Sequence, residues 1–217
     1  MLLLCSLLYF LVTSIQAQAN TLPRDEGKFL CLIYLSVQIP SDLNALIEIA
    51  KELGKMDWNF DLNPCDGDWN SSLKDNSQFN NSVVCGNCSP GGVCHVVEIV
   101  IKGQNLAGVL PPSLAKLPSI HKIDLSFNYL NGTIPPQWAS TKLDFLILEN
   151  NMFSGVIPAE LGKLTNLSKL VLSANNLTGK LPEELNLLTN LIELRISSNN
   201  FSGKIPNLGN CIKLQQL

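Results

Sequence analysis

A pattern of apolar residues, asparagine, glycine and proline recurs along this chain at a nearly constant interval, and it constrains the fold more than any other feature. Each complete copy reads apolar-x-x-apolar-x-apolar-x-x-Asn-x-apolar-x-Gly-x-apolar-Pro. Complete copies fill the stretch from Ile120 to Pro206, and a fainter copy begins at Ile99. The asparagine position advances by 24, 23, 24 and 24 residues, falling on Gln104, Asn128, Asn151, Asn175 and Asn199. So many matched positions at a fixed interval indicate a repeated structure rather than a chance excess of leucine.

The local chemistry of one copy predicts its path. The apolar alternation, as in Ile123-x-Leu125, suits a short strand with one buried face. The asparagine that follows can satisfy backbone groups that an inward turn leaves unpaired, because its amide both donates and accepts hydrogen bonds. The Gly-x-Ile-Pro segment then returns the chain along the far side. This period and pattern are typical of leucine-rich repeats, so we predict an α/β leucine-rich-repeat solenoid with short parallel strands on its concave face.

Such a solenoid needs its ends covered. Ser41 or Asp42 is predicted to begin a helix that ends at Leu53, and this helix, with Trp58 and Trp69, is expected to cover the first repeat. Its predicted apolar face consists of Leu43, Leu46, Ile47, Ala50 and Leu53. Residues 208–217 fit the start of a sixth repeat, which we interpret as truncated.

The remaining composition fits a secreted chain. A net charge of −3 with 15 % charged residues argues against a nucleic-acid partner. Residues 1–19 are predicted to be a signal peptide, with cleavage after Ala19 or, as second choice, Ala17; the alternative is an N-terminal anchor, but the apolar run is short for a span. The predicted organisation is a signal peptide over 1–19, a cap region over 20–95 with an atypical apolar insert near 27–42, five repeats over 96–207 and a truncated sixth repeat over 208–217.

Four cysteines cluster before the first repeat and suggest two disulfides in a secreted chain. They are Cys65, Cys85, Cys88 and Cys94. Three pairings are possible, and we favour Cys65–Cys85 with Cys88–Cys94. A zinc site that adds His95, or a redox-active Cys85-x-x-Cys88 motif, is a weaker alternative, because secretion is oxidising and no βαβ unit surrounds the motif. Cys31 and Cys211 are predicted to be unpaired.

Several Asn-x-Ser/Thr sequences are candidate N-glycosylation sites in such a chain. The predicted acceptors are Asn70, Asn80, Asn131, Asn166, Asn176 and Asn200. A seventh sequence at Asn87 is the weakest, since that residue lies between cysteines expected to be bridged. The alternative for each is an ordinary loop asparagine.

The sequence contains no recognisable catalytic constellation or phosphate-binding glycine loop, so we expect no enzyme activity and no cofactor. A solenoid offers a contact surface instead, because side chains that alternate with buried strand residues point outward. The predicted binding face consists of Lys122, Asp124, Phe145, Ile147, Glu149, Lys169, Val171, Glu193 and Arg195. Phe145, Ile147 and Val171 are expected to form a central apolar spot with charges around it; the alternative is that these are ordinary exposed strand residues.

Motifs outside the repeats sharpen the assignment. The repeat itself resembles the plant-specific class, and further motifs resemble plant leucine-rich-repeat receptor-like serine/threonine kinases that also carry an extracellular malectin-like domain. Those motifs are Leu22-Pro23-Arg24-Asp25-Glu26, Asn44-Ala45-Leu46, residues 53–60, Asn63-Pro64-Cys65 and Cys94-His95-Val96-Val97. The resemblance implies an ectodomain that senses an extracellular cue, and it covers nearly the whole mature chain except the insert. Because no position matches a kinase motif, no catalytic residue is carried over.

Two functions follow from these observations. The first is the sensing ectodomain of a receptor-like kinase, which would bind an extracellular peptide, glycan or protein. A co-receptor ectodomain is a further candidate partner. The expected location is the apoplast or the outer side of the plasma membrane. The second is a free secreted protein such as an inhibitor of cell-wall-degrading enzymes. The lack of a capping repeat at the carboxyl end favours the first. An enzyme has no support beyond the kinase label of the resembling family.

Overall fold

The computed structural model describes residues 41–65, 79, 81–90 and 93–217, all within one unit spanning 41–217. The predicted signal peptide and the insert as far as residue 40 lie outside these described residues. So do Cys31, Trp69 and the predicted glycosylation sites at Asn70 and Asn80.

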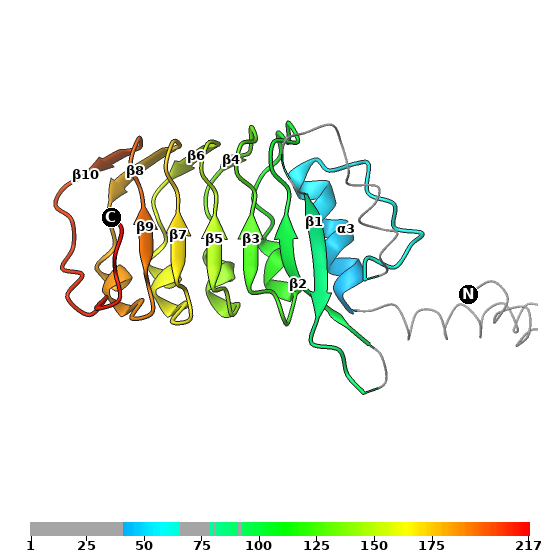
Figure 1. Cartoon of the computed structure of the whole chain (residues 1–217). Coiled ribbons are helices and arrows are strands. Elements are labelled where there is room, and N and C mark those ends of the chain that lie inside the picture. Colours follow the sequence, from blue (N-terminus) through cyan, green and yellow to red (C-terminus); the bar gives the residue numbers. More distant parts are fainter. Residues whose placement is uncertain (1–40, 66–78, 80, 91–92) are drawn as a thin grey trace, which may run out of the picture. The chain divides into compact units, whose positions relative to one another are not determined.

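The main sheet runs along the unit and is built from β1 of the cap and one strand from each of five repeats (Figure 1). Its strands follow the order β1-β2-β3-β5-β7-β9, and all neighbours are parallel except the β1·β2 pair. Their bounds are β1 Ser82–Gly86, β2 His95–Val100, β3 Lys122–Asp124, β5 Phe145–Ile147, β7 Lys169–Val171 and β9 Glu193–Arg195. The predicted parallel strands therefore exist, and β3 is displaced by one residue from the Ile123-x-Leu125 alternation.

A second, smaller sheet lies along the edge where each coil turns away from the main sheet (Figure 1). It pairs β4 Asn131–Gly132, β6 Met152–Gly155, β8 Asn176–Lys180 and β10 Asn200–Ser202 in parallel. The coils then return through short 3-10 helices, η1 Pro112–Lys116, η2 Pro136–Ser140, η3 Ala159–Lys163 and η4 Glu183–Leu187. A proline precedes or opens each of these helices, as the Gly-x-Ile-Pro half of the repeat predicts.

The asparagines form the predicted internal ladder. Asn151, for example, accepts a hydrogen bond from Leu130 N (3.1 Å) and donates to the carbonyl oxygens of Leu125 and Leu148 (3.0 and 3.2 Å). Asn128, Asn175 and Asn199 repeat this pattern one coil apart. At the Gln104 position the side chain instead accepts a hydrogen bond from the buried Lys55 (2.8 Å), which ties the cap to the first coil.

Helix α3 (Ser41–Leu53) covers the first coil, as predicted, and Gly108 lies against its last turn. The predicted apolar face is partly wrong, since Ile47 is 43 % exposed and Ile49 is fully buried. The buried positions are Asp42, Ala45, Leu46, Ile49, Ala50 and Leu53. Burial of Asp42 sets this face, because its carboxylate accepts a hydrogen bond from Val96 N in β2 (2.6 Å). The helix begins at Ser41 and ends at Leu53, as predicted, so residues 41 and 42, which the approximate bounds of the insert also included, belong to the cap helix.

Candidate binding face

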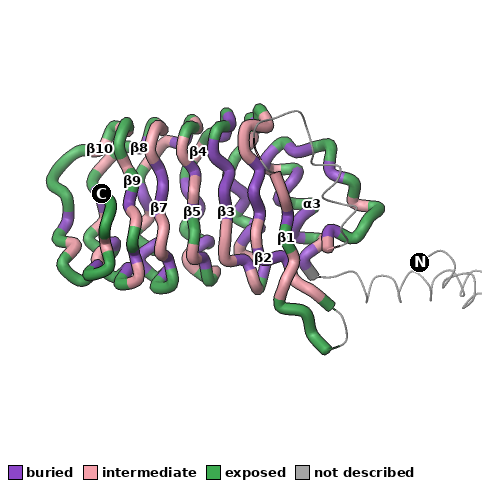
Figure 2. Tube along the Cα trace, viewed as in Figure 1, coloured by how far each residue is buried: buried purple, intermediate pink, exposed green. Residues whose placement is uncertain are grey.

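The parallel register places side chains from successive coils in columns across the main sheet. Lys122 is level with Phe145, Phe145 with Lys169, and Lys169 with Glu193. We call the outward side chains of β2, β3, β5, β7 and β9, with those of the second residue after each strand, the strand face. Along it, outward residues, most of them exposed or half-buried, alternate with buried aliphatic residues that hold each strand to the core (Figure 2).

The first column carries ion pairs on both sides of an aromatic ring. Lys122 Nζ lies 2.9 Å from Glu98 Oε2, and Lys169 Nζ lies 2.7 Å from Glu193 Oε2. Phe145 sits between the two lysines and is 36 % exposed. Arg195, in the second column, adds a contact of 2.6 Å from its Nε to Glu193 Oε1. These predicted face residues are therefore all on the surface, but their charges already have partners.

The second column corrects two of the sequence-based expectations. Asp124 is 6 % exposed and Val171 is 1 % exposed, so neither can contribute much contact surface. Strand neighbours lie about 4.8 Å apart, and flanking side chains cover a short one between them. Asp124 is further held by Ser126 Oγ (2.5 Å) and Lys102 Nζ (3.3 Å). The apolar spot is thus reduced to Phe145 and the half-buried Ile147.

An aromatic and cationic group at the first repeats was missed by the sequence reasoning. The rings of Phe79 and Phe127 stack with centroids 5.3 Å apart, and Lys102 Nζ lies 5.5 and 5.9 Å from them. Phe127 occupies the left-handed backbone region (φ 59°). Asn150, Ala174 and Ser198 do so at the same repeat position. That recurring turn directs Phe127 away from the core, a signal that apolar patterning alone does not carry.

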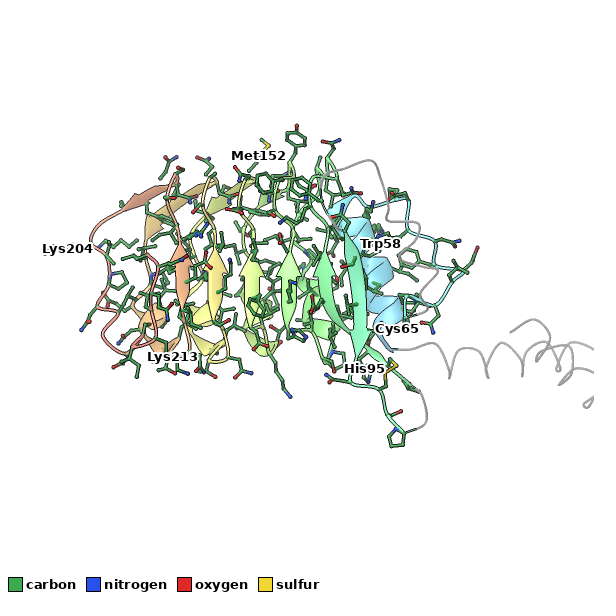
Figure 3. The ribbon with its side chains drawn as sticks, in the orientation of Figure 1. Trp58, Cys65, His95, Met152, Lys204 and Lys213 are labelled. Atoms are coloured by element: carbon green, nitrogen blue, oxygen red, sulfur yellow. A yellow bond between two sulfur atoms is a disulfide. The ribbon has the colours of Figure 1, made fainter. Side chains whose placement is uncertain are left out.

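A shallow hollow of about 300 Å³ adjoins the lower end of the strand face. Asp144, Phe145, Ser168, Ile192 and Lys213 contribute to its lining. Lys213, at the foot of the coils in Figure 3, donates to Asn190 Oδ1 (2.7 Å). The Asp144 carboxylate lies 3.9 Å from His121 Nδ1, too far for a hydrogen bond. The hollow has no acid/base pair in hydrogen-bonding contact that would suggest chemistry, and it extends the contact surface from Phe145.

The cysteine cluster lies at the cap rather than on the strand face. Cys65 is bonded to Cys85 and Cys88 to Cys94, which is the pairing favoured above. The alternatives of a zinc site and a redox-active dithiol do not fit, because all four sulfur atoms are in disulfides. His95, near Cys65 in Figure 3, contacts Asp42 Oδ1 instead (3.2 Å). No group of residues suited to a metal ion occurs in the described part of the chain.

The four predicted glycosylation sites that the structure describes are all exposed. Asn131, Asn176 and Asn200 each begin a strand of the second sheet, near the edge where Figure 3 labels Met152. Asn166 precedes β7 and borders the shallow hollow. None of the four belongs to the strand face, so glycans at the second sheet would leave that face open.

Comparison with known proteins places the repeats in a family. The Leucine Rich Repeat family model matches residues 119–140, 142–164, 166–188 and 190–211. The crystal structure of the leucine-rich-repeat ectodomain of the receptor kinase SOBIR1 from Arabidopsis thaliana is 32 % identical, with a TM-score of 0.66. That alignment covers 81 % of this chain and 89 % of the SOBIR1 ectodomain. The chain belongs to the leucine-rich-repeat family of plant receptor-like kinases.

Other members of this receptor family align over similar regions. The BIR2 ectodomain from Arabidopsis thaliana is 30 % identical, with a TM-score of 0.61, over 76 % of this chain and 83 % of that ectodomain. A "probable leucine-rich repeat receptor-like serine/threonine-protein kinase" of the same plant is 42 % identical over 139 residues. That alignment covers 61 % of this chain but 13 % of the kinase. The chain thus matches only a small part of the full-length receptors, and the solved structures show that part to be the extracellular solenoid.

Proposed function

We propose that this chain is an extracellular ligand-binding module, the sensing part of a plant receptor-like kinase ectodomain in cell-surface signalling. The observation that carries the proposal is the strand face, on which Phe145, Ile147 and a set of charged side chains from successive coils are presented on a rigid scaffold. A face spread over several coils suits an extended peptide, a glycan or a protein surface. Among the described residues no helix is long and apolar enough to cross a bilayer.

Solved relatives support the assignment to recognition. The GASSHO1/SCHENGEN3 ectodomain, 28 % identical to this chain with a TM-score of 0.65, was crystallised in complex with CASPARIAN STRIP INTEGRITY FACTOR 2. That alignment covers 81 % of this chain and 20 % of that ectodomain. We extend this by analogy to an extracellular ligand for the present chain, with a co-receptor ectodomain as a second partner.

The proposal is tested by measuring binding of the disulfide-bonded chain to a panel of extracellular peptides, cell-wall oligosaccharides and leucine-rich-repeat ectodomains. Phe145→Asp is expected to weaken whichever partner binds, because it removes the exposed aromatic ring from the strand face. Arg195→Glu is expected to weaken a partner that contacts the coil of β9, because it removes the cation next to Glu193. Met152→Asp and Lys163→Glu make comparable changes at exposed positions off that face. A partner that tolerates both face variants as well as the two controls would show that the strand face is not the binding site.

We further propose that the full receptor belongs to the subgroup with a malectin-like domain. The motifs Leu22-Pro23-Arg24-Asp25-Glu26 and Cys94-His95-Val96-Val97 support this subgroup. Genomic sequence downstream of the codon for Leu217 provides the test. A malectin-like reading frame followed by a kinase frame would support the subgroup, whereas a kinase frame without the malectin-like part would contradict it.

A further inference from the structure

The charged side chains of the strand face are unevenly paired, and one carboxylate has no cationic partner. Its cations are Lys102, Lys122, Lys169 and Arg195, and each has a carboxylate within 3.3 Å. Those partners are Asp124, Glu98 and, for the last two, Glu193. Glu149 is the remaining carboxylate of this face, and no ion pair or side-chain hydrogen bond involves it in the described part of the chain. The four cations and four carboxylates of the strand face cancel in number, because Glu193 serves two cations. The one carboxylate without a cationic partner lies on the coil that contains β5.

The surroundings of Glu149 explain why it has no partner. Its neighbours in the column are Ser126, one coil before, and Ser173, one coil after. Ser126 donates to Asp124 Oδ1, while Ser173 Oγ accepts a hydrogen bond from Ser197 (3.2 Å). Glu149 is half-buried, so a ligand laid over the face would remove water from this carboxylate. Dehydrating an ionised carboxylate without giving it a partner is unfavourable.

The same coil presents the exposed apolar surface of the strand face. Phe145 and Ile147 alternate with the buried Leu146, so both point outward on the side that carries Glu149. The flanking Lys122 and Lys169 are held by Glu98 and Glu193, so neither is free to serve as an anion site at Phe145. An apolar pair with one unpaired carboxylate beyond it is complementary to a segment that carries an apolar side chain and a cationic one.

We propose that the strand face at β5 binds an extended peptide segment in which an aliphatic or aromatic residue lies close to a lysine or arginine. The apolar side chain packs on Phe145 and Ile147, and the cation pairs with Glu149. A neutral glycan would leave Glu149 dehydrated and unpaired, and a polyanionic one would bring further negative charge next to it, so this unpaired carboxylate favours a basic peptide over either. This inference rests on the proposed function, because it assigns the ligand chemistry of the same face.

An array of random synthetic dodecapeptides, probed at physiological salt with the whole secreted chain, provides the test. The wild-type chain is expected to retain peptides enriched in lysine or arginine next to apolar residues. Glu149→Gln should weaken the retained peptides about two- to fivefold, the range of a partly exposed ion pair. Glu149→Lys should shift the enrichment toward aspartate and glutamate, a gain that misfolding cannot produce. Glu160→Gln removes an exposed carboxylate from η3, off the face, and is expected to change nothing.

The outcomes separate this inference from the proposed function. If retained peptides depend on Phe145 but their charge preference is the same for wild type and Glu149→Lys, the basic-peptide assignment is wrong while the strand face remains the binding site. If the wild-type chain retains no peptide, the assignment is also wrong. In that case Phe145→Asp against an oligosaccharide or ectodomain partner decides whether the proposed function stands.

Discussion

Removing one rung of the asparagine ladder should cost less than its number of hydrogen bonds suggests. Asn151 Nδ2 donates to the carbonyl oxygens of Leu125, Leu148 and Glu149, and each of these has a second donor. Those donors are Asn128 Nδ2, Asn175 Nδ2 and Phe127 N. The N–H of Leu130, in contrast, donates to Asn151 Oδ1 and lies at a fully buried residue. Asn151→Ala therefore leaves mainly one buried donor unsatisfied.

The unsatisfied N–H of Leu130 sets the expected loss of stability. A buried donor left without a partner costs about 1–3 kcal/mol, so we expect Asn151→Ala to lower the free energy of unfolding by about 2 kcal/mol. Asn175→Ala should cost a similar amount for the same reason, since Phe153 N loses Asn175 Oδ1 while the carbonyl oxygens of Leu148 and Leu172 keep other donors.

The ladder's shared acceptors make a double-mutant cycle decisive. Leu148 O accepts from both Asn151 and Asn175, so removing both leaves this carbonyl oxygen bare. The Asn151→Ala/Asn175→Ala pair should therefore cost about 1 kcal/mol more than the sum of the single changes. Asn151 and Asn199 share no acceptor, and their double variant should be additive within about 0.5 kcal/mol.

Denaturant unfolding at 25 °C under non-reducing conditions measures these free energies, with the slope checked for each variant because solenoids can depart from two-state behaviour. Asn210→Ala is the matched control, since the exposed Asn210 side chain takes part in no hydrogen bond of the described residues. The reasoning fails if both double variants are equally additive, or if the control costs as much as Asn151→Ala.

Three shorter predictions concern the cap, its disulfides and the last coil. Gly108→Ala should destabilise the chain by about 1–3 kcal/mol, because a Cβ there would meet the backbone of α3 at 2.0 Å. Gly86→Ala is the control and should cost less, because its Cβ would meet only a side chain at 3.3 Å. The midpoints of thermal unfolding of the two variants compare these costs. Replacing Cys65 and Cys85 by serine should lower the free energy of unfolding by about 3 kcal/mol, and replacing Cys88 and Cys94 should lower it by about 2 kcal/mol, because the second disulfide closes a shorter loop. Equal losses in denaturant unfolding would contradict this dependence on loop length. Burial raises the pKa of the Cys211 thiol, so it should resist alkylation in the native state at pH 8 and react once unfolded. Because the unfolded thiol loses its proton first as pH rises, the free energy of unfolding should fall slightly above about pH 8.5; rapid native labelling would be inconsistent with this burial.

Much of the solenoid could be predicted because its interior is periodic. A strand, an inward asparagine and a proline-led return each have a local chemical signal, so the order of these segments follows from a single copy of the repeat. The strand bounds were less well predicted, since β3 is displaced by one residue from the Ile123-x-Leu125 alternation. The favoured disulfides also appear in the structure, since a pairing of near neighbours suits a compact cap.

What sequence reasoning missed depends on contacts outside one repeat. The face of α3 is displaced because Asp42 bonds to β2, a partner about fifty residues away in sequence. The strand β1, which lies in the predicted cap region, pairs antiparallel with β2. Val171 satisfies the outward alternation of its strand and is nevertheless covered by its neighbours in the column. Alternation gives the side to which a residue points, but its exposure depends on neighbouring coils.

The residues that lie side by side on neighbouring coils can be identified from the sequence, because the parallel register pairs residues about one period apart. Glu98 and Lys122 are 24 residues apart and form an ion pair, as do Lys169 and Glu193. Applied to Glu149, the same interval leads to Ser126 and Ser173, neither of which is charged. Glu149 therefore lacks a charged partner because of which residues the repeat alignment places beside it, whichever rotamer its side chain adopts. A basic residue introduced by Ser173→Lys should neutralise Glu149 from within the chain, and it should abolish the preference for basic peptides without altering Glu149 itself.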